Sequence, residues 1–228
     1  MTTEIEIYSA TYGMVKFNIL VVSKTIIINL DRQTTKNYWT KRYEMEETGW
    51  DIGKVSRPLK TYFDQLEDKA IKILIPGAGN AYEAGYLLNK GFNNVYVLDI
   101  SEKPLLEFKK RYPDFPKTQL LCEDFFAHEG SYDLIIEQTF FCSFPPLKSS
   151  RHTYANRMCH LLKDSGKLVG LWFDIPLTDD VQKHPFGGDS TLYLYYLTAY
   201  FRPKVFEKCY NSIPERANNE LFGIFIKI

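Results

Sequence analysis

The chain of 228 residues is long enough for one well-buried domain and short for two. Its 28 basic and 28 acidic side chains cancel, and the longest run of like charge that we find, Lys109 to Arg111, is short. A nucleic-acid surface needs a concentrated basic patch. We therefore expect a small-molecule substrate and no nucleic acid as partner. We also expect a monomer without a membrane partner.

The cysteines and the N-terminal segment indicate the compartment. No C-x-x-C pair and no histidine at ligand spacing accompanies Cys122, Cys142, Cys159 and Cys209. We expect reduced thiols, a cytoplasmic protein and no metal site. The most apolar N-terminal piece, Phe17 to Leu30, is interrupted by polar residues and precedes no small-residue cleavage site. It resembles neither a membrane span nor a secretion signal.

Residues 1–30 differ from the rest of the chain. They contain two β-like runs, Val15 to Val22 and Thr25 to Leu30, without the periodicity found later. We treat residues 1–30 as an N-terminal extension of unknown role. Residues 31–228 are expected to form a single domain.

From Ile71 onward, short β-rich runs alternate with segments of helical period, which is the pattern of a βαβ architecture. The runs predict seven strands, at Ile71–Ile75, Val95–Leu98, Thr118–Leu121, Tyr132–Glu137, Lys167–Phe173, Lys204–Tyr210 and Leu221–Lys227.

Helices are predicted between these strands, at Ala81–Lys90, Glu102–Arg111, Arg151–Leu162 and Thr191–Phe201. Only Asn211 to Glu220 separates the last two strands, which is too short for a crossover helix, so these strands should pair antiparallel. We expect an α/β fold with a seven-stranded, mostly parallel, doubly wound Rossmann-like sheet and an antiparallel last strand.

The stretch "ILIPGAGNA", Ile73 to Ala81, ends the first of these strands in paired glycines. Glycines let a ligand approach the backbone closely, and the free N–H groups of a helix start can donate to it. Asp99 ends the next strand 22 residues after Gly77, where doubly wound folds place a carboxylate on a ribose diol. A plain strand-to-helix turn is the alternative, but the combination favours an adenosine-type cofactor.

The bulk of Tyr82 helps to distinguish the cofactors. Dinucleotide sites need a glycine or alanine at the sixth position of the loop, and Tyr82 occupies that position here. S-adenosylmethionine is therefore favoured over a nicotinamide or flavin cofactor. At the third strand, a carboxylate of Glu123-Asp124-Phe125 can accept from an adenine amino group while the aromatic ring packs on the base. A solvated acid at a strand end is the alternative.

The residues quoted so far, together with "YWTKRYEMEETGWDIG" at Tyr38 to Gly53, carry a family likeness. From Tyr38 to Ile228 the chain resembles class I S-adenosylmethionine-dependent methyltransferases of the thiopurine methyltransferase superfamily, nearest to the thiol and halide methyltransferase branch. The Tyr38 to Gly53 segment is similar to the family's N-terminal lid, in which tryptophans close over the cofactor. The likeness implies that the cofactor contacts the aromatic residues of this lid, Trp39, Tyr43 and Trp50.

Tyr43 stands where plant members of the family have tryptophan. Indole faces can attract a sulfonium centre by cation–π interaction. In the alternative reading, Trp39 and Trp50 only anchor the segment on the core.

Further segments follow the same likeness. "IPGAGNAYEA" is similar to the family's glycine loop, "VLDIS" to its ribose site, "CEDFF" to its adenine site and "EQTFFCSF" to the segment beside the transferable methyl group. The likeness implies cofactor roles for Gly77, Gly79, Asp99, Asp124, Phe125 and Gln138. Many class I enzymes carry an acid where this chain has Ile75, so Glu83 is expected to hold the methionine amino group instead.

Two departures narrow the expected substrate. Mammalian thiopurine enzymes have an arginine directly after the acid that ends strand four, and this chain has Gln138 there, which disfavours thiopurine drugs. Amino-group methyltransferases place a polar residue and two prolines directly after that strand. Here the prolines of Phe144-Pro145-Pro146 come later, which disfavours N-methylation.

The expected activity is methyl transfer from S-adenosylmethionine to a small soft nucleophile (a thiol, sulfide or halide) by in-line displacement in a dry aromatic pocket. No catalytic residue is assigned, although Tyr43 and Glu137 are candidate proton acceptors. The glycines of "HPFGGDS", His184 to Ser190, suit a second, flexible lid, with an ordinary surface loop as the alternative, and His184 is expected to be structural. The alternatives are a non-catalytic S-adenosylmethionine or S-adenosylhomocysteine sensor and a nicotinamide-dependent oxidoreductase. Candidate pocket residues are Phe140, Phe141, Phe144, Phe173 and Phe186.

Overall fold

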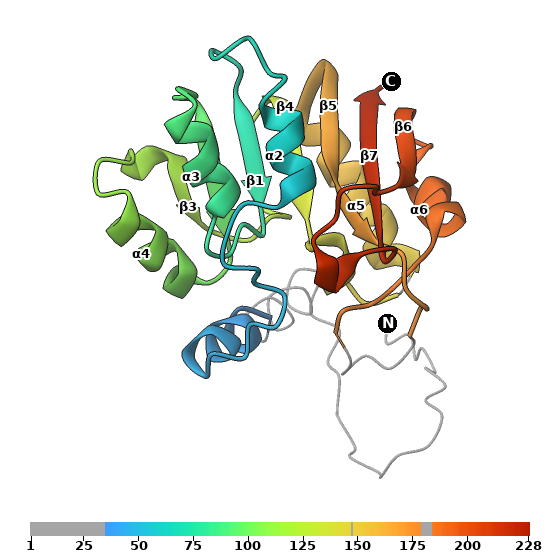
Figure 1. Cartoon of the computed structure of the whole chain (residues 1–228), viewed down its shortest axis with the longest axis horizontal. Helices are drawn as coiled ribbons and strands as arrows, with labels where there is room; N and C mark the ends of the chain where they lie inside the picture. The colour runs from blue at the N-terminus through green and yellow to red at the C-terminus, as the bar shows by residue number, and fades with distance from the viewer. Residues whose placement is uncertain (1–34, 147, 179–183) are drawn as a thin grey trace, which may run out of the picture.

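A computed structural model describes residues 35–146, 148–178 and 184–228 (Figure 1). The predicted runs Val15–Val22 and Thr25–Leu30 lie outside these residues. The seven predicted strands form one sheet, whose spatial order is β3 (Leu120–Cys122), β2 (Val95–Asp99), β1 (Ile73–Pro76), β4 (Tyr132–Gln138), β5 (Leu162–Phe173), β7 (Glu220–Lys227) and β6 (Phe201–Lys208).

The pairing of the strands confirms the predicted mostly parallel sheet. Strand β1 pairs parallel with β2 and β4, β2 pairs parallel with β3, and β4 pairs parallel with β5. Strand β7 is antiparallel to both β5 and β6 and lies between them. The sequence predicted the antiparallel β6–β7 pair but not the insertion of β7 beside β5. Strands β2 and β3 lie on one side of β1, whereas β4 and the later strands lie on its other side. The boundary between β1 and β4 is therefore the switch point, where sheets of this kind bind ligands.

Helices cover both faces of the sheet (Figure 1). Four of the labelled helices were predicted, with boundary shifts: the last one ends at Leu197, so that Phe201 opens β6 instead of closing the helix. Two helical segments were not predicted, namely α2 and residues 35–44. The labelled helices are α2 (Arg57–Phe63), α3 (Tyr82–Asn89), α4 (Glu102–Arg111), α5 (Lys148–Leu161) and α6 (Ser190–Leu197), with 3₁₀ turns η1 (Lys117–Gln119), η2 (Phe141–Ser143) and η3 (Pro214–Arg216).

Successive residues of β1 pack into two separate hydrophobic cores, because side chains alternate between the two faces of a strand. Ile73 and Ile75 pack with residues of α2, α3 and α4 on one face of the sheet. Leu74 packs with residues of α5 and α6 on the other face. This two-sided burial explains why β1 is apolar along its whole length.

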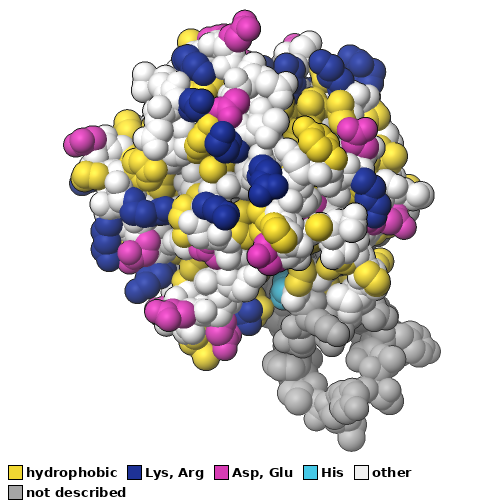
Figure 2. All heavy atoms as spheres, viewed as in Figure 1, with side chains coloured by type: hydrophobic (Ala, Val, Ile, Leu, Met, Phe, Trp, Pro, Cys, Tyr) yellow, Lys and Arg dark blue, Asp and Glu magenta, His cyan; other side chains and the backbone are white. Residues whose placement is uncertain are grey.

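The helical segment at residues 35–44 lies beyond the carboxyl ends of the parallel strands, the blue helix of Figure 1. The hydroxyl of Thr40 lies 3.1 Å from that of Ser101, which follows β2. Figure 2 shows basic and acidic side chains interspersed on the face in view, as the balanced charge suggests. Among the described residues, no helix has both the length and the apolar character needed to cross a membrane.

Gly170, in the middle of β5, makes room for a buried side chain of β4. It pairs with Glu137 on one side and Gly223 on the other. A Cβ at this position would overlap the carbonyl oxygen of Glu137 and lie 2.5 Å from its Cβ. The sheet must therefore shift if this glycine is replaced.

Gly170→Ala is expected to lower the free energy of unfolding by about 1–3 kcal/mol, the usual cost of overpacking a core, as measured by urea denaturation. Gly49→Ala serves as the control, because a Cβ added there meets nothing within 4 Å. Equal stability of the two variants would show that β4 and β5 separate without cost.

Candidate functional site

The turn between β1 and α3 has the backbone that its glycines suggest. Gly77 and Gly79 have φ angles of +58° and +54°, which L-residues rarely adopt. A Cβ on Gly77 would overlap the ring of Phe140, and one on Gly79 would lie 2.8 Å from the hydroxyl of Tyr43. Both positions therefore require glycine for its backbone angle and for close approach.

A cleft opens beside this turn and joins segments far apart in the sequence. It brings together Trp50 from the lid segment, the glycine turn, the start of α3, and Gln138 at the end of β4. The cleft is lined by Trp50, Asp51, Ile52, Ile75, Pro76, Gly77, Ala78, Gly79, Asn80, Tyr82, Glu83, Gln138 and Thr139.

Asp99 lies at the carboxyl end of β2, next to the glycine turn. Its carboxylate accepts hydrogen bonds from the backbone N–H of Gly79 at 2.9 Å and of Ser101 at 2.8 Å. Burial raises the pKa of Asp99 to about 6, although these N–H groups oppose the shift. Each carboxylate oxygen has two lone pairs, so the group can still accept from a ligand hydroxyl.

The three aromatic residues of the predicted lid pack together around Trp50. The ring centroid of Trp50 lies 5.4 Å from that of Trp39 and 5.7 Å from that of Tyr43, both edge-to-face. The guanidinium of Arg216 donates to the carbonyl of Trp50 at 2.6 Å. Burial, and then the charge of Asp99, raise the pKa of Tyr43 well above its usual range. The phenol therefore keeps its proton near neutral pH, which argues against Tyr43 as a proton acceptor.

His184 joins the lid to the far side of the cleft. Its Nε2 lies 3.3 Å from the carbonyl oxygen of Ser143, and its Nδ1 lies 3.3 Å from the hydroxyl of Tyr38. Because a carbonyl only accepts, Nε2 carries the proton and Nδ1 accepts from Tyr38. Burial lowers the pKa of His184, which keeps the ring neutral. The histidine acts as a structural link, as expected from the sequence.

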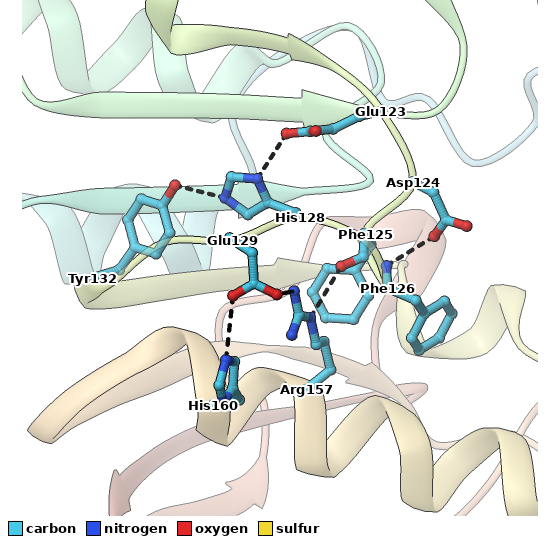
Figure 3. Close-up of polar contacts among 9 residues, drawn as sticks. All are labelled: Glu123, Asp124, Phe125, Phe126, His128, Glu129, Tyr132, Arg157 and His160. Carbon is cyan, nitrogen blue, oxygen red and sulfur yellow. Dashed lines mark hydrogen bonds and ion pairs between the residues drawn. The ribbon is translucent and has the colours of Figure 1, made fainter.

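The segment between β3 and β4 holds the predicted adenine residues and is fixed from two sides (Figure 3). His128 contacts Glu123 through Nδ1 and Tyr132 through Nε2, both at 2.7 Å. Arg157 of α5 donates to the carbonyl of Phe125 at 3.4 Å and forms an ion pair with Glu129. Sequence reasoning missed this network, whose signal is the spacing of His128 and Tyr132.

Neither predicted adenine residue lines the cleft beside the glycine turn. Phe125 is buried, and its ring centroid lies 5.2 Å from that of Phe140. Asp124 accepts a hydrogen bond from the backbone N–H of Phe126 at 2.8 Å, which shapes the loop (Figure 3). Their adenine roles remain predictions.

Glu137 is a fully buried carboxylate that shapes the turn after β4. Its Oε1 accepts from the backbone N–H groups of Phe140 at 2.8 Å and Phe141 at 3.0 Å, and its Oε2 accepts from the hydroxyl of Tyr154. Burial raises its pKa to about 7. Since both oxygens are engaged inside the core, Glu137 has a structural role, and its candidacy as a proton acceptor loses support.

The predicted pocket phenylalanines separate into two groups. Phe140 and Phe144 are half-buried, and their ring centroids lie 4.9 Å apart. Phe141 is 1% exposed and packs edge-on against Tyr154, so it supports the core instead of lining a pocket.

The other two predicted pocket rings pack against other side chains. Phe186 is fully buried against His184, with ring centroids 4.5 Å apart. The ring centroid of Phe173 lies 5.1 Å from the guanidinium carbon of Arg216. The local sequence does not distinguish phenylalanines that line a pocket from those that pack in the core.

Gln138 and two acids complete the polar lining of the cleft. Among the described residues, the buried Oε1 of Gln138 has no hydrogen-bond partner. Glu83 is 6% exposed, accepts from the backbone N–H of Ser56 at 3.1 Å and has its pKa raised to about 7 by burial. Asp51, which sequence reasoning did not single out, accepts from Gly53 N–H at 2.6 Å and from the side chain of Asn80. Two carboxylates at this wall suit a ligand ammonium group.

The model of one protein family matches most of this chain. Residues 34–224 match the family described as "Thiopurine S-methyltransferase (TPMT)". The chain belongs to the thiopurine S-methyltransferase family.

Two curated relatives from Arabidopsis thaliana are similar to this family member. A "Probable thiol methyltransferase 2" is 31% identical over 158 residues, covering 67% of this chain and 69% of the relative. A "Thiocyanate methyltransferase 1" is 28% identical over 217 residues, covering 92% and 93%.

Solved structures share the fold at low identity. The Burkholderia thailandensis 1,6-didemethyltoxoflavin-N1-methyltransferase with S-adenosylhomocysteine has a TM-score of 0.69 at 16% identity, covering 92% of this chain and 93% of its own. A Synechocystis magnesium protoporphyrin IX methyltransferase with S-adenosylhomocysteine has a TM-score of 0.66 at 14% identity, covering 87% and 100%. These likenesses establish the class I methyltransferase fold.

The residues of this S-methyltransferase fit S-adenosylmethionine as cofactor. The turn at Gly77 and Gly79 is a cradle that a Cβ would fill. Asp99 lies next to it at the end of β2. The Oε1 of Gln138, which has no partner among the described residues, is the kind of buried acceptor that a bound ligand satisfies. The enzyme is an S-adenosylmethionine-dependent methyltransferase.

Asp99→Asn is expected to weaken S-adenosylhomocysteine binding by about 1.5–3 kcal/mol at pH 8, the range for hydrogen bonds to charged groups. Diol donors favour the ionised carboxylate, whose pKa in the free protein is about 6. Wild-type affinity should therefore rise as the pH increases through about 6, and this rise should flatten in the variant. Calorimetry from pH 5 to 8 measures both, and parallel pH curves would remove Asp99 from the site.

Proposed function

We propose that this methyltransferase acts on small soft nucleophiles: thiolates, hydrosulfide, thiocyanate or halide ions. One observation carries the proposal: the candidate proton acceptors Glu137 and Tyr43, and the nearby His184, are each engaged or protonated. Glu137 is enclosed in hydrogen bonds, Tyr43 keeps its proton, and both nitrogens of His184 are engaged. Nucleophiles with a free lone pair and a negative charge need no base.

The names of the relatives support the same class of acceptor. The curated relatives are described as a probable thiol methyltransferase and a thiocyanate methyltransferase, which both name small sulfur nucleophiles. Gln138, which replaces the arginine of the mammalian enzymes, supports a small acceptor instead of a thiopurine.

The chain's own residues perform orientation and the exclusion of water. When bound, S-adenosylmethionine supplies a methyl group on a positively charged sulfur, which is already an activated electrophile. Trp39 and Trp50 can cover this positive charge by cation–π attraction. Phe140 and Phe144 form an apolar wall at the end of β4, which strips water from a weakly hydrated nucleophile.

The transfer needs no proton from the protein. The attacking sulfur or halide forms a bond to the methyl carbon while the bond from that carbon to the cofactor's sulfur breaks, and its electron pair stays on that sulfur. The products are the methylated acceptor and S-adenosylhomocysteine. Alignment is the main contribution of the enzyme.

Purified protein with S-adenosylmethionine should methylate at least one of hydrosulfide, a simple thiol, thiocyanate and iodide, as measured by gas chromatography of the volatile products. At saturating S-adenosylmethionine, the rate with thiols should rise with pH as the thiolate fraction grows, whereas the rate with thiocyanate should stay flat. Amines and nucleic acids should be inert. Turnover of an amine alone would contradict the proposal, and tight cofactor binding without any turnover would favour a sensor protein.

A further inference from the structure

Arg151 is a buried arginine whose charge the described part of the protein leaves uncompensated. It lies at the end of the first turn of α5 and is 1% exposed. Its Nη2 donates to the carbonyl of Gly187 at 3.2 Å, and its guanidinium carbon lies 4.9 Å from the ring centroid of Phe141. Within the described residues, Nε and Nη1 have no hydrogen-bond partner.

No neighbour that the structure describes neutralises this charge. The described carboxylates form no ion pair with Arg151, and burial raises the pKa of both Cys142 and Tyr193 well above the usual range, so both are uncharged near pH 7. An arginine keeps its proton in proteins. Burying an unpaired charge costs several kcal/mol of folding free energy. The N-terminal end of α5, where Arg151 lies, adds to the positive potential through the helix dipole. The position therefore favours an anion.

Contacts place Arg151 near the turn after β4, which is the side of the site proposed for the methyl acceptor. Phe141, on which it stacks, follows Phe140, whose ring covers Gly77. The backbone N–H of Phe186 donates to the carbonyl of Cys142 at 2.9 Å, which brings residues 186–188 next to the same turn. Arg151 thus lies between the turn after β4 and residues 186–188. Asp99 lies on the other side of β1, at the end of β2.

We propose that Arg151 binds the methyl acceptor as a small anion through Nε and Nη1. The inference rests on the proposed function and adds that the acceptor is negatively charged when it binds. A guanidinium is weakly hydrated, which matches soft anions such as thiocyanate, iodide and hydrosulfide. For a thiol acceptor, the same charge stabilises the thiolate and lowers the pKa of the bound thiol. The proton goes to solvent before transfer, which explains the lack of a base.

With thiocyanate the charges and atoms balance. The sulfur lone pair of thiocyanate forms the new bond to the methyl carbon, and the pair of the broken carbon–sulfur bond stays on the cofactor's sulfur. The negative charge of the acceptor and the positive charge of the sulfonium cancel. Methyl thiocyanate and S-adenosylhomocysteine leave without any proton transfer.

Three variants test the role of Arg151. Arg151→Gln removes the charge, Arg151→Lys keeps the charge but loses the planar fork, and Arg202→Gln is the matched control because Arg202 is exposed on β6. Arg151→Gln should raise the KM for thiocyanate at least tenfold while S-adenosylhomocysteine affinity stays within twofold. Arg151→Lys should raise KM several-fold, and Arg202→Gln should match the wild type.

A direct titration keeps the test independent of turnover and of variant stability. Thiocyanate titrated into the wild-type complex with S-adenosylhomocysteine, in chloride-free buffer, should bind saturably by calorimetry, and Arg151→Gln should abolish this binding. No saturable binding to the wild type, or an unchanged KM in a folded Arg151→Gln, would overturn the role of Arg151. If the wild type turns over no soft nucleophile, the proposed function fails, whereas turnover with an unchanged KM in Arg151→Gln removes only the anion site.

Discussion

The buried carboxylate of Glu137 fixes the part of the structure on which the acceptor side depends. It accepts from the backbone N–H groups of Phe140 and Phe141 and from the hydroxyl of Tyr154, and Gly170 on the neighbouring strand leaves room for it. A buried carboxylate is tolerated only when its lone pairs are satisfied. The resulting turn directs the ring of Phe140 onto the glycine turn. Phe141, one residue on, enters the core beneath Arg151.

The switch point of the sheet separates two tasks that methyl transfer requires. On the β1–β2 side, the glycine turn and Asp99 form a rigid backbone surface suited to the cofactor. On the β4–β5 side, Phe140 and Phe144 form an apolar wall, and the buried guanidinium of Arg151 lies against Phe141, where we propose that a soft anion binds. The lid joins the two sides through His184, which bonds both Tyr38 and Ser143. In the proposed arrangement, the cofactor, the acceptor and the lid segment meet at one edge of the sheet.

Features encoded locally could be predicted from the sequence. Strand alternation, the glycine turn and the acid at Asp99 follow from short motifs, and the structure places all three as expected. The position of β7 between β5 and β6 could not be predicted, because pairing partners are not encoded within a strand. Phe140 and Phe141 are identical neighbours, yet only Phe141 is fully buried, where its ring packs edge-on against Tyr154 of the distant helix α5. Arg151 lies in a polar helix that suggests a surface residue, and only tertiary packing buries it.

The central claim is that a soft anion binds beside the cofactor at the end of β4, held by a buried arginine. Iodide tests this directly, because its anomalous scattering locates it in a crystal without ambiguity. Crystals of the wild-type protein with S-adenosylhomocysteine and iodide should show an anomalous peak in contact with the Nε and Nη1 atoms of Arg151. Ordered S-adenosylhomocysteine on the glycine turn, with iodide bound only elsewhere on the protein, would contradict the account.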